Sequence, residues 1–237
     1  MIVLGIDTSG YANAVGVIDG EKVLADFTFE ARTDSLEKIV SNIDFALRSA
    51  KLALNDVQGI GVGLGPGSWT GIRVGVTVGK ILAFGTSKPV VGVPTLEALA
   101  YGARNEASLI CPVISAGTRD TVYAAFYRAK DGIVAREGEY YVGDVSGLAK
   151  MVIEPAVFVG LEAEAYRRSI SQAPGSLKIS IRAVEAVPNG AVVARLAAIR
   201  LEHGEGDDAL YLTPLYLKES TARAFLGRYA GNAGVRD

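Results

Sequence analysis

The sequence predicts an α/β protein made of two similar lobes. Short apolar runs alternate with longer segments in which apolar residues recur at helical spacing, and the order of these elements occurs twice along the chain. The chain has 237 residues, which corresponds to one or two domains at ~150 residues each. Hydrophobic residues make up 49% and charged residues 21% of it, which is typical of a globular protein and excludes a disordered chain.

Residues 1–104 are predicted to form the first lobe. Two β-prone runs flank Asp19-Gly20, a dipeptide typical of hairpin turns. A capping box formed by Asp34 and Glu37 predicts the start of the first helix. The expected strands are 2–7, 12–18, 22–30, 57–64 and 90–91, and two further helices are expected from Trp69 and Thr95. Three strands, helix, strand, helix, strand is the order of a ribonuclease H-like lobe.

Residues 105–237 are predicted to repeat this order in a second ribonuclease H-like lobe. Lys130-Asp131-Gly132 separates two β-prone runs and indicates a second hairpin. The expected strands are 109–114, 121–128, 133–142 and 156–160, and helices are expected near 144, over 161–170 and over 190–203. The C-terminal segment is expected to pack back on the first lobe.

Composition excludes several classes of function. Lys and Arg number 24 and Asp and Glu 26, so a net charge of −2 does not favour binding of nucleic acid by the chain alone. The single cysteine, Cys111, lies in an apolar run and is expected to be a buried, inert thiol, and the single histidine is His203. These counts predict no disulfide framework and no metal site. The absence of a basic leader and of a ~20-residue apolar span predicts a soluble, cytoplasmic protein.

A glycine-rich loop at 65–71 is the strongest local signal, because it stands between a predicted strand and a predicted helix. Free backbone N–H groups at a helix start attract anions, so this loop and the turn after the first strand are a candidate nucleotide or anion site. The candidate residues are Asp7, Thr8, Ser9, Gly65, Gly67 and Ser68. The alternative is that the glycines serve only the turn and close packing. The loop is not a P-loop, since Lys80 lies far along the helix.

Small residues recur every four positions along the second helix, at Gly71, Gly75, Gly79 and Ala83. Glycine costs ~1 kcal/mol per residue inside a helix relative to alanine, so this face must permit a close approach. Two interpretations follow: the face packs on the protein's own sheet, or it meets a helix of another subunit. Phe45, on the far side of the first helix from its apolar face, is either a surface aromatic or a docking residue.

Three motifs together resemble the TsaB (YeaZ) family of tRNA threonylcarbamoyladenosine biosynthesis subunits. They are residues 1–9 (MIVLGIDTS), 65–75 (GPGSWTGIRVG) and 92–97 (GVPTLE). The resemblance is strong over residues 1–100. In the second half it is carried by Val122-Tyr123 and by residues 214–218 (PLYLK).

The resemblance implies an actin/hexokinase/Hsp70-like (ASKHA) fold and a non-catalytic subunit that supports a catalytic TsaD-type subunit. It implies a TsaE-type ATPase as a further partner, a homodimer when the chain is alone, and tRNA bound only through the complex. ATP and Mg²⁺ are implied for the complex and no cofactor for the isolated chain. The first two helices are the implied interface, with Leu36, Ile39, Phe45, Gly71, Ile72, Gly75, Val78, Gly79 and Leu82 as its candidate residues.

The chain departs from the family pattern at two places. Residues 32–35 (RTDS) lack the histidine that often precedes the first helix, and residues 115–119 (SAGTR) replace an Asp-Ala-Arg-like turn. A nucleotide role that uses that aspartate is therefore not expected. Two rival functions remain. One is an ATP- or phosphate-binding enzyme of the same fold that uses Asp7, Thr8 and the glycine-rich loop. The other is a peptidase, which the lack of a metal pair or a catalytic triad disfavours.

Overall fold

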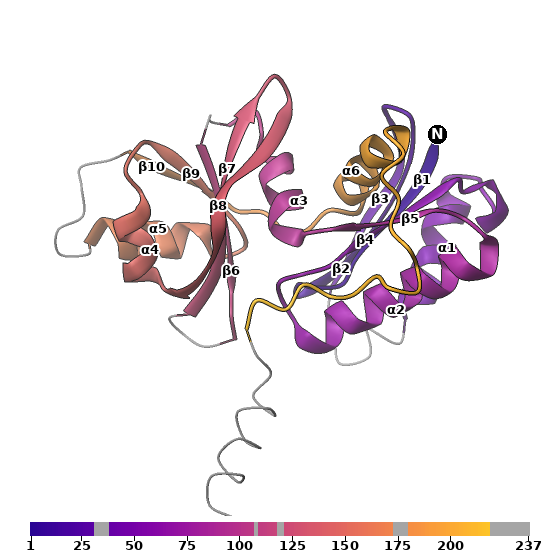
Figure 1. Cartoon of the computed structure of the whole chain (residues 1–237), viewed down its shortest axis with the longest axis horizontal. Coiled ribbons are helices and arrows are strands. Elements are labelled where there is room, and N and C mark those ends of the chain that lie inside the picture. The colour runs from indigo at the N-terminus through magenta and orange to yellow at the C-terminus, as the bar shows by residue number, and fades with distance from the viewer. Residues whose placement is uncertain (31–37, 107–108, 118–120, 173–179, 219–237) are drawn as a thin grey trace, which may run out of the picture.

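The computed structural model contains two mixed β-sheets, one in each half of the chain (Figure 1). It describes residues 1–30, 38–106, 109–117, 121–172 and 180–218. Within these residues the strand orders are β3-β2-β1-β4-β5 and β10-β9-β6-β7-β8. Read from the hairpin edge, each sheet therefore has its third, second, first, fourth and fifth strand side by side. This order confirms the prediction of two ribonuclease H-like lobes.

The first sheet follows the predicted apolar runs. Its strands are β1 (Ile2–Asp7), β2 (Ala12–Asp19), β3 (Lys22–Glu30), β4 (Gly59–Gly63) and β5 (Val90–Val93). β1 pairs antiparallel with β2 and parallel with β4. Gly20 has a φ of +53°, a conformation that glycine adopts without steric cost, so the Asp19-Gly20 hairpin is confirmed.

Helices α1 (Ile39–Ser49) and α2 (Trp69–Thr86) cover one face of this sheet, and a short 3-10 turn (Leu54–Asp56) precedes β4. Their buried side chains share one core with those of β1, β2 and β4. Ile39, Ile43 and Leu47 on the inner side of α1 are buried, whereas Val40 is exposed. Asp34, the predicted cap, lies outside the described residues.

The second sheet contains β6 (Leu109–Ser115), β7 (Thr121–Lys130), β8 (Ile133–Asp144), β9 (Ala156–Val159) and β10 (Ile181–Val184). Helices α4 (Val145–Met151) and α5 (Ala163–Gln172) pack against it. Asp131 and Gly132 both have positive φ angles at the hairpin between β7 and β8, which confirms that turn. Cys111 is fully buried in β6, and burial raises the pKa of its thiol, as expected of an inert cysteine.

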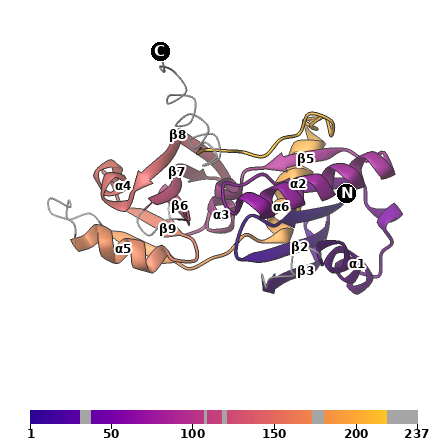
Figure 2. The same ribbon diagram turned by 90° about the horizontal axis from the view of Figure 1, so that it is seen from below.

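Each half of the chain sends one helix to the other half's sheet. α3 (Thr95–Gly102) follows β5 but packs Leu96 and Leu99 against Ile110 and Tyr127 of the second sheet. α6 (Gly190–Glu202) follows β10 but packs on the first sheet, on the face opposite α1 and α2 (Figure 2). The two lobes are therefore joined by buried helices as well as by the chain connections. None of the helices in the described ranges is long and apolar enough to cross a bilayer.

A segment without helix or strand, residues 205–218, returns from α6 along the edge of the first sheet (Figure 1). We call it the strap. Asp207 forms a bridge with Val90 of the edge strand β5, and its carboxylate accepts a 2.8 Å hydrogen bond from the Gly92 N–H. Leu212 is buried in the core of the first sheet. On the side of the strap that faces α2, Lys80 Nζ donates to the carbonyl oxygens of Leu210 and Leu212, each at 3.0 Å.

Candidate functional site

The turn after β1 buries a carboxylate among hydroxyl groups. Asp7 is fully buried, and its Oδ1 accepts hydrogen bonds from the N–H and the Oγ–H of Ser9, at 2.8 and 2.6 Å. Its Oδ2 accepts from the Thr95 hydroxyl at 2.8 Å. That hydroxyl also accepts from the Gly65 N–H at 3.2 Å. Both carboxylate oxygens of Asp7 are therefore engaged inside the protein.

Two opposing effects act on this carboxylate. Burial raises the pKa of Asp7, because the charged form loses its hydration, and the hydrogen bonds from Ser9 and Thr95 lower it. Burial is the larger effect, so the pKa of Asp7 lies above its ordinary value. The carboxylate is thus fully buried, and its hydrogen bonds connect the turn after β1 to Thr95 at the start of α3.

The same turn fixes the start of α2. The Thr8 hydroxyl donates to the Gly71 carbonyl oxygen at 2.6 Å, and the Ser68 N–H donates to the Ser9 carbonyl oxygen at 2.7 Å. Ser68 is the N-cap of α2, since its Oγ accepts from the Gly71 N–H at 3.2 Å. These contacts support the reading in which the glycine-rich loop serves the turn and close packing.

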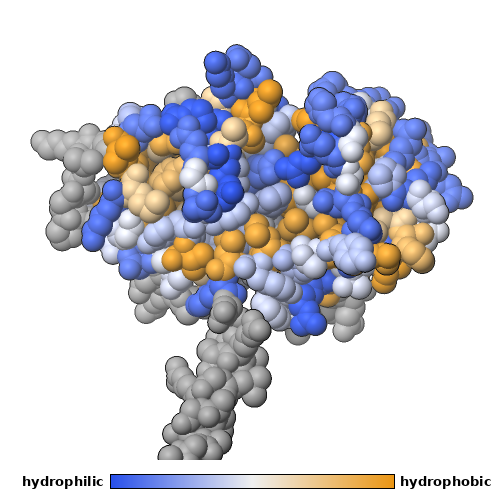
Figure 3. All heavy atoms as spheres, viewed as in Figure 1, coloured by the Kyte–Doolittle hydropathy of each residue, from blue (hydrophilic) through white to orange (hydrophobic). Residues whose placement is uncertain are grey.

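A cleft of about 940 Å³ separates the two lobes. Of the six predicted anion-site residues, Ser9, Gly67 and Ser68 line it, whereas Asp7, Thr8 and Gly65 do not. The opposite wall comes from β6, β7 and the start of α5. On the face of the molecule shown in Figure 3, apolar residues form a band between the two lobes. The cleft is thus mainly an apolar space, with the anion-site candidates divided between its wall and the interior of the protein.

The charged groups at the cleft are few. Arg73 and Lys218 line it from the first lobe and the strap, and Glu162 lines it from the second lobe, where Glu162 Oε2 accepts a 2.6 Å hydrogen bond from the Tyr166 hydroxyl. Among the residues that the structure describes, no group of three or more His, Cys, Asp or Glu side chains could hold a metal ion. The described residues that line the cleft therefore give it a mainly apolar surface with few reactive side chains.

The predicted glycine interface needs a correction, because this face of α2 packs on the protein's own sheet. A Cβ atom added at Gly71 or Gly75 would overlap Thr8, and one added at Gly79 would overlap a methyl group of Val62. Ile72 and Ile39 are buried in the same core. The close approach that the glycines permit is therefore between α2 and both the turn after β1 and the strand β4. All five positions are buried within the single chain.

Helices α1 and α2 carry several exposed apolar residues on their outer sides. Phe45 is 51% exposed, although its ring packs edge-on against Phe27 with centroids 4.9 Å apart. Val78 and Leu82 are half-buried, and Leu36 lies outside the described residues. Three apolar residues that were not among the predicted interface residues are also exposed: Val40 at 61%, Ile81 at 64% and Phe84 at 73%.

Thr95 is the site residue that sequence reasoning missed. It lies 88 residues from Asp7 along the chain, yet its hydroxyl joins Asp7, Ser9 and Gly65 in one network. Its place in the GVPTLE motif was visible, but nothing in the sequence indicated which group it would meet.

Comparisons with known proteins agree on one family. The family model described as "TsaD: tRNA N6-adenosine threonylcarbamoyltransferase" matches residues 29–225. The tRNA threonylcarbamoyladenosine biosynthesis protein TsaB of Bacillus subtilis is 28% identical over 227 residues, which cover 94% of this chain and 97% of that protein.

Two solved structures extend this agreement to the fold. YeaZ from Pseudomonas aeruginosa is 26% identical with a TM-score of 0.76, covering 91% of this chain and 99% of that one. A ROK hexokinase from Thermus thermophilus has a TM-score of 0.50 at 16% identity, covering 85% of this chain and 100% of that one, and shows a likeness of fold alone.

Proposed function

The chain belongs to the TsaB (YeaZ) branch of the threonylcarbamoyltransferase family, and we propose that it is a non-catalytic subunit that docks on a TsaD-type catalytic subunit. In this role it supports the formation of N6-threonylcarbamoyladenosine on tRNA. The observation that carries the proposal is the set of exposed apolar side chains on the outer faces of α1 and α2, namely Val40, Phe45, Ile81 and Phe84. We call these four residues the docking face.

The apolar side chains of the docking face are better suited to burial against a protein partner than to exposure to water. Exposed apolar residues are common when they stand alone, but large apolar side chains gathered on neighbouring elements mark interaction sites. α1 and α2 cover the same face of one sheet, so their outer sides point away from the same core (Figure 2). Aromatic side chains such as Phe45 and Phe84 bury large areas on docking. The glycine face of α2 supports the docking face by holding the helix close to its sheet.

The hydrogen bonds that Asp7 accepts inside the protein favour this role over that of a phosphate-handling enzyme. An enzyme of this fold would need a carboxylate at the turn after β1 that is free to face a metal–phosphate group. Here Ser9 and Thr95 occupy both oxygens of Asp7, and Asp7 does not line the cleft. Its carboxylate would have to lose these bonds before it could serve an ATP- or sugar-phosphate-binding site.

Further partners follow from the same role. We propose that a TsaE-type ATPase and tRNA bind the assembled complex rather than this chain alone. For tRNA the reason is the chain's net charge of −2, which gives it little attraction for nucleic acid. In the absence of the TsaD-type subunit, two copies pair through the same docking face. ATP and Mg²⁺ act in the complex, and the work takes place in the cytoplasm.

The direct test is calorimetric titration of the full chain into the TsaD-type subunit of the same organism. Ile81→Glu places a charge in the docking face and should weaken binding by about tenfold or more, because central interface residues contribute ~2 kcal/mol or more. The matched control is Ile153→Glu, which changes the same residue type at 76% exposure in the second lobe and should bind normally. Equal affinity of both variants and the parent chain would contradict the docking face.

The enzymatic alternative has its own measurement. Titration of the isolated chain with ATP and Mg²⁺ should give no binding heat if the chain is a supporting subunit. Tight binding of ATP by the isolated chain would favour the rival function. The same preparation should show a dimer by sedimentation that Ile81→Glu converts to a monomer.

A further inference from the structure

The strap runs along α2, on the side of that helix away from α1 (Figure 2). α1 packs on β2 and β3, whereas α2 packs on β4 and β5, nearer to the edge of the sheet where Asp207 of the strap bridges to β5. Toward the C-terminal end of α2, Lys80 Nζ binds backbone carbonyl groups of the strap. At the N-terminal end, the Tyr216 ring stacks on Trp69, with centroids 4.3 Å apart. The strap therefore contacts α2 at two places and runs in the opposite direction to it.

A tight turn in the strap begins at Asp208 and ends at Leu212, and we call it the strap turn. The Asp208 carbonyl oxygen accepts from the N–H groups of Tyr211 and Leu212, at 3.1 and 2.9 Å. Asp208 Oδ1 accepts from the Leu210 N–H at 2.7 Å. From the α2 side, Lys80 Nζ donates to the carbonyl oxygens of Leu210 and Leu212. Since the Leu212 side chain is also buried in the core of the first sheet, the turn is fixed through both its backbone and a side chain.

The strap turn exposes two large apolar side chains, Leu210 at 67% and Tyr211 at 79%. Turns favour Gly, Pro, Asn, Asp and Ser for backbone reasons, so the turn itself does not call for these two side chains. On α2, Ile81 directly follows Lys80, and Phe84 lies one helical turn beyond it. Both are exposed as well. Lys80 therefore has exposed apolar residues near it on two elements, two on the helix and two on the strap turn.

The four residues of the docking face are too few to form a stable interface on their own. Stable protein–protein interfaces bury roughly 800 Å² on each partner and involve about 20–30 residues a side. A partner that covers Ile81 and Phe84 must therefore also cover the surface around them. The strap turn borders this part of α2 through Lys80, and its exposed side chains supply further apolar area there.

We propose that the strap turn is a second part of the docking surface, and that the TsaD-type subunit contacts Leu210 and Tyr211 together with the docking face. This inference rests on the proposed function, because it takes the partner from there. Lys80 is a positioning residue in it, since its hydrogen bonds hold the strap turn against α2. A turn that is already fixed loses little conformational freedom on binding, so more of the burial of its apolar side chains contributes to affinity.

The first test is calorimetric titration of the TsaD-type subunit of the same organism with the full-length variant Leu210→Ser/Tyr211→Ser. Both side chains are exposed, so the variant should fold like the parent chain, and its affinity should fall about tenfold or more. The matched control is Tyr11→Ser/Ile133→Ser, which removes a tyrosine at 72% exposure and an aliphatic side chain at 70% exposure elsewhere on the surface. The control should bind like the parent chain.

The second test separates the positioning role of Lys80 from a contact of its own with the partner. Lys80→Met keeps an unbranched side chain but loses the hydrogen bonds to the strap turn, so it should weaken binding about threefold or more in the parent chain. In the Leu210→Ser/Tyr211→Ser background the same change should have no further effect, because the side chains that Lys80 positions are already gone. Equal losses in the two backgrounds would overturn the positioning role.

The outcomes distinguish this inference from the proposed function. If Ile81→Glu weakens binding while Leu210→Ser/Tyr211→Ser binds like the parent chain, the docking face stands and the strap turn has no part in it. If neither variant weakens binding, the docking face falls as well. A Leu210→Ser/Tyr211→Ser chain that loses its homodimer but keeps full affinity for the TsaD-type subunit would assign the strap turn to contact between two copies, which also overturns the inference.

Discussion

Helices α2 and α5 occupy equivalent places in the two lobes, yet their surfaces are opposite in character. Each connects the fourth strand of its sheet to the fifth. The glycines of α2 pack against its sheet, and Ile81 and Phe84 on its outer side are exposed. α5 buries the larger side chains of Tyr166 and Ile170 against its sheet and turns charged and polar groups outward.

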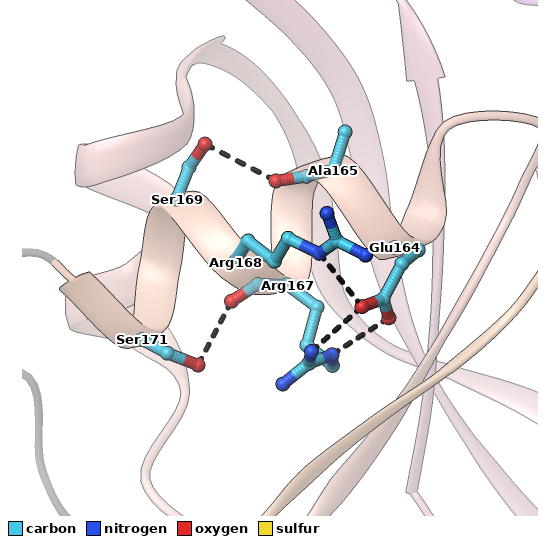
Figure 4. Close-up of polar contacts among 6 residues, drawn as sticks. All are labelled: Glu164, Ala165, Arg167, Arg168, Ser169 and Ser171. Carbon is cyan, nitrogen blue, oxygen red and sulfur yellow. Dashed lines mark hydrogen bonds and ion pairs between the residues drawn. The ribbon is translucent and has the colours of Figure 1, made fainter.

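The charged side chains on the outer side of α5 form ion pairs with one another. Glu164 accepts two hydrogen bonds from Arg167, both at 2.7 Å, and a third from Arg168 at 3.0 Å (Figure 4). Ser169 and Ser171 donate to the carbonyl oxygens of Ala165 and Arg167 one turn earlier. Such a face is stable in water. The contrast teaches that the same position in the fold holds a helix with a charged outer side in one lobe and a helix with exposed apolar side chains in the other.

The largest expected effect is on the glycine face of α2. Gly71→Ala should destabilise the protein by ~3 kcal/mol, because the new methyl group would overlap the Thr8 carbonyl group, which cannot move without shifting β1. Urea unfolding measures the change. The matched control is Gly85→Ala on the same helix, where a Cβ atom meets nothing within 4 Å, and it should stabilise by about 0.5–1 kcal/mol. Similar effects at both positions would show that α2 does not depend on close packing.

A second change tests the turn that anchors α2. Thr95→Val removes the hydroxyl that donates to Asp7 and accepts from the Gly65 N–H, so it should destabilise by ~2 kcal/mol. Thr77→Val, on the exposed side of α2, should change stability by less than ~0.5 kcal/mol. Thermal unfolding of both variants decides whether the network is structural. No loss in Thr95→Val would mean that Asp7 is available for another role.

The order of helices and strands was predictable because the spacing of apolar residues and the turn residues can be recognised in short stretches of sequence. Both hairpins and most strands follow from them. β10 escaped prediction because it is only four residues long and contains Arg182. The glycine spacing on α2 showed that something approaches closely, but spacing cannot say whether the neighbour is Thr8 and Val62 or another subunit. The Asp7–Thr95 contact depends on tertiary folding alone, so no local pattern could reveal it.

The pH dependence of stability tests the buried carboxylate of the first lobe. Because burial raises the pKa of Asp7 in the folded state above 3.8, the folded protein keeps a proton that the unfolded chain releases. The stability of the parent chain relative to Asp7→Asn should therefore fall as pH rises above 3.8 and level off once Asp7 is ionised in both states. Urea unfolding of the pair across this range measures it. A relative stability that rises with pH would mean that the hydrogen bonds outweigh burial.

The smallest expected effect is on the outer side of α5. Arg167 and Arg168 lower the pKa of Glu164 to about 2 in the folded protein. The contribution of Glu164 is therefore fully present above its ordinary pKa of 4.5 and is lost as pH falls through about 2. Glu164→Gln should lower the midpoint of urea unfolding slightly at pH 7 and progressively less as pH falls below 4. An unchanged difference across this range would show that the ion pairs do not stabilise α5.

Hydrogen–deuterium exchange of the full chain, with and without the TsaD-type subunit, tests the docking face most directly. The account predicts that binding slows exchange in α1 (Ile39–Ser49) and α2 (Trp69–Thr86) and leaves α5 (Ala163–Gln172) unchanged. Slower exchange confined to α5, with α1 and α2 exchanging as in the free chain, would contradict it.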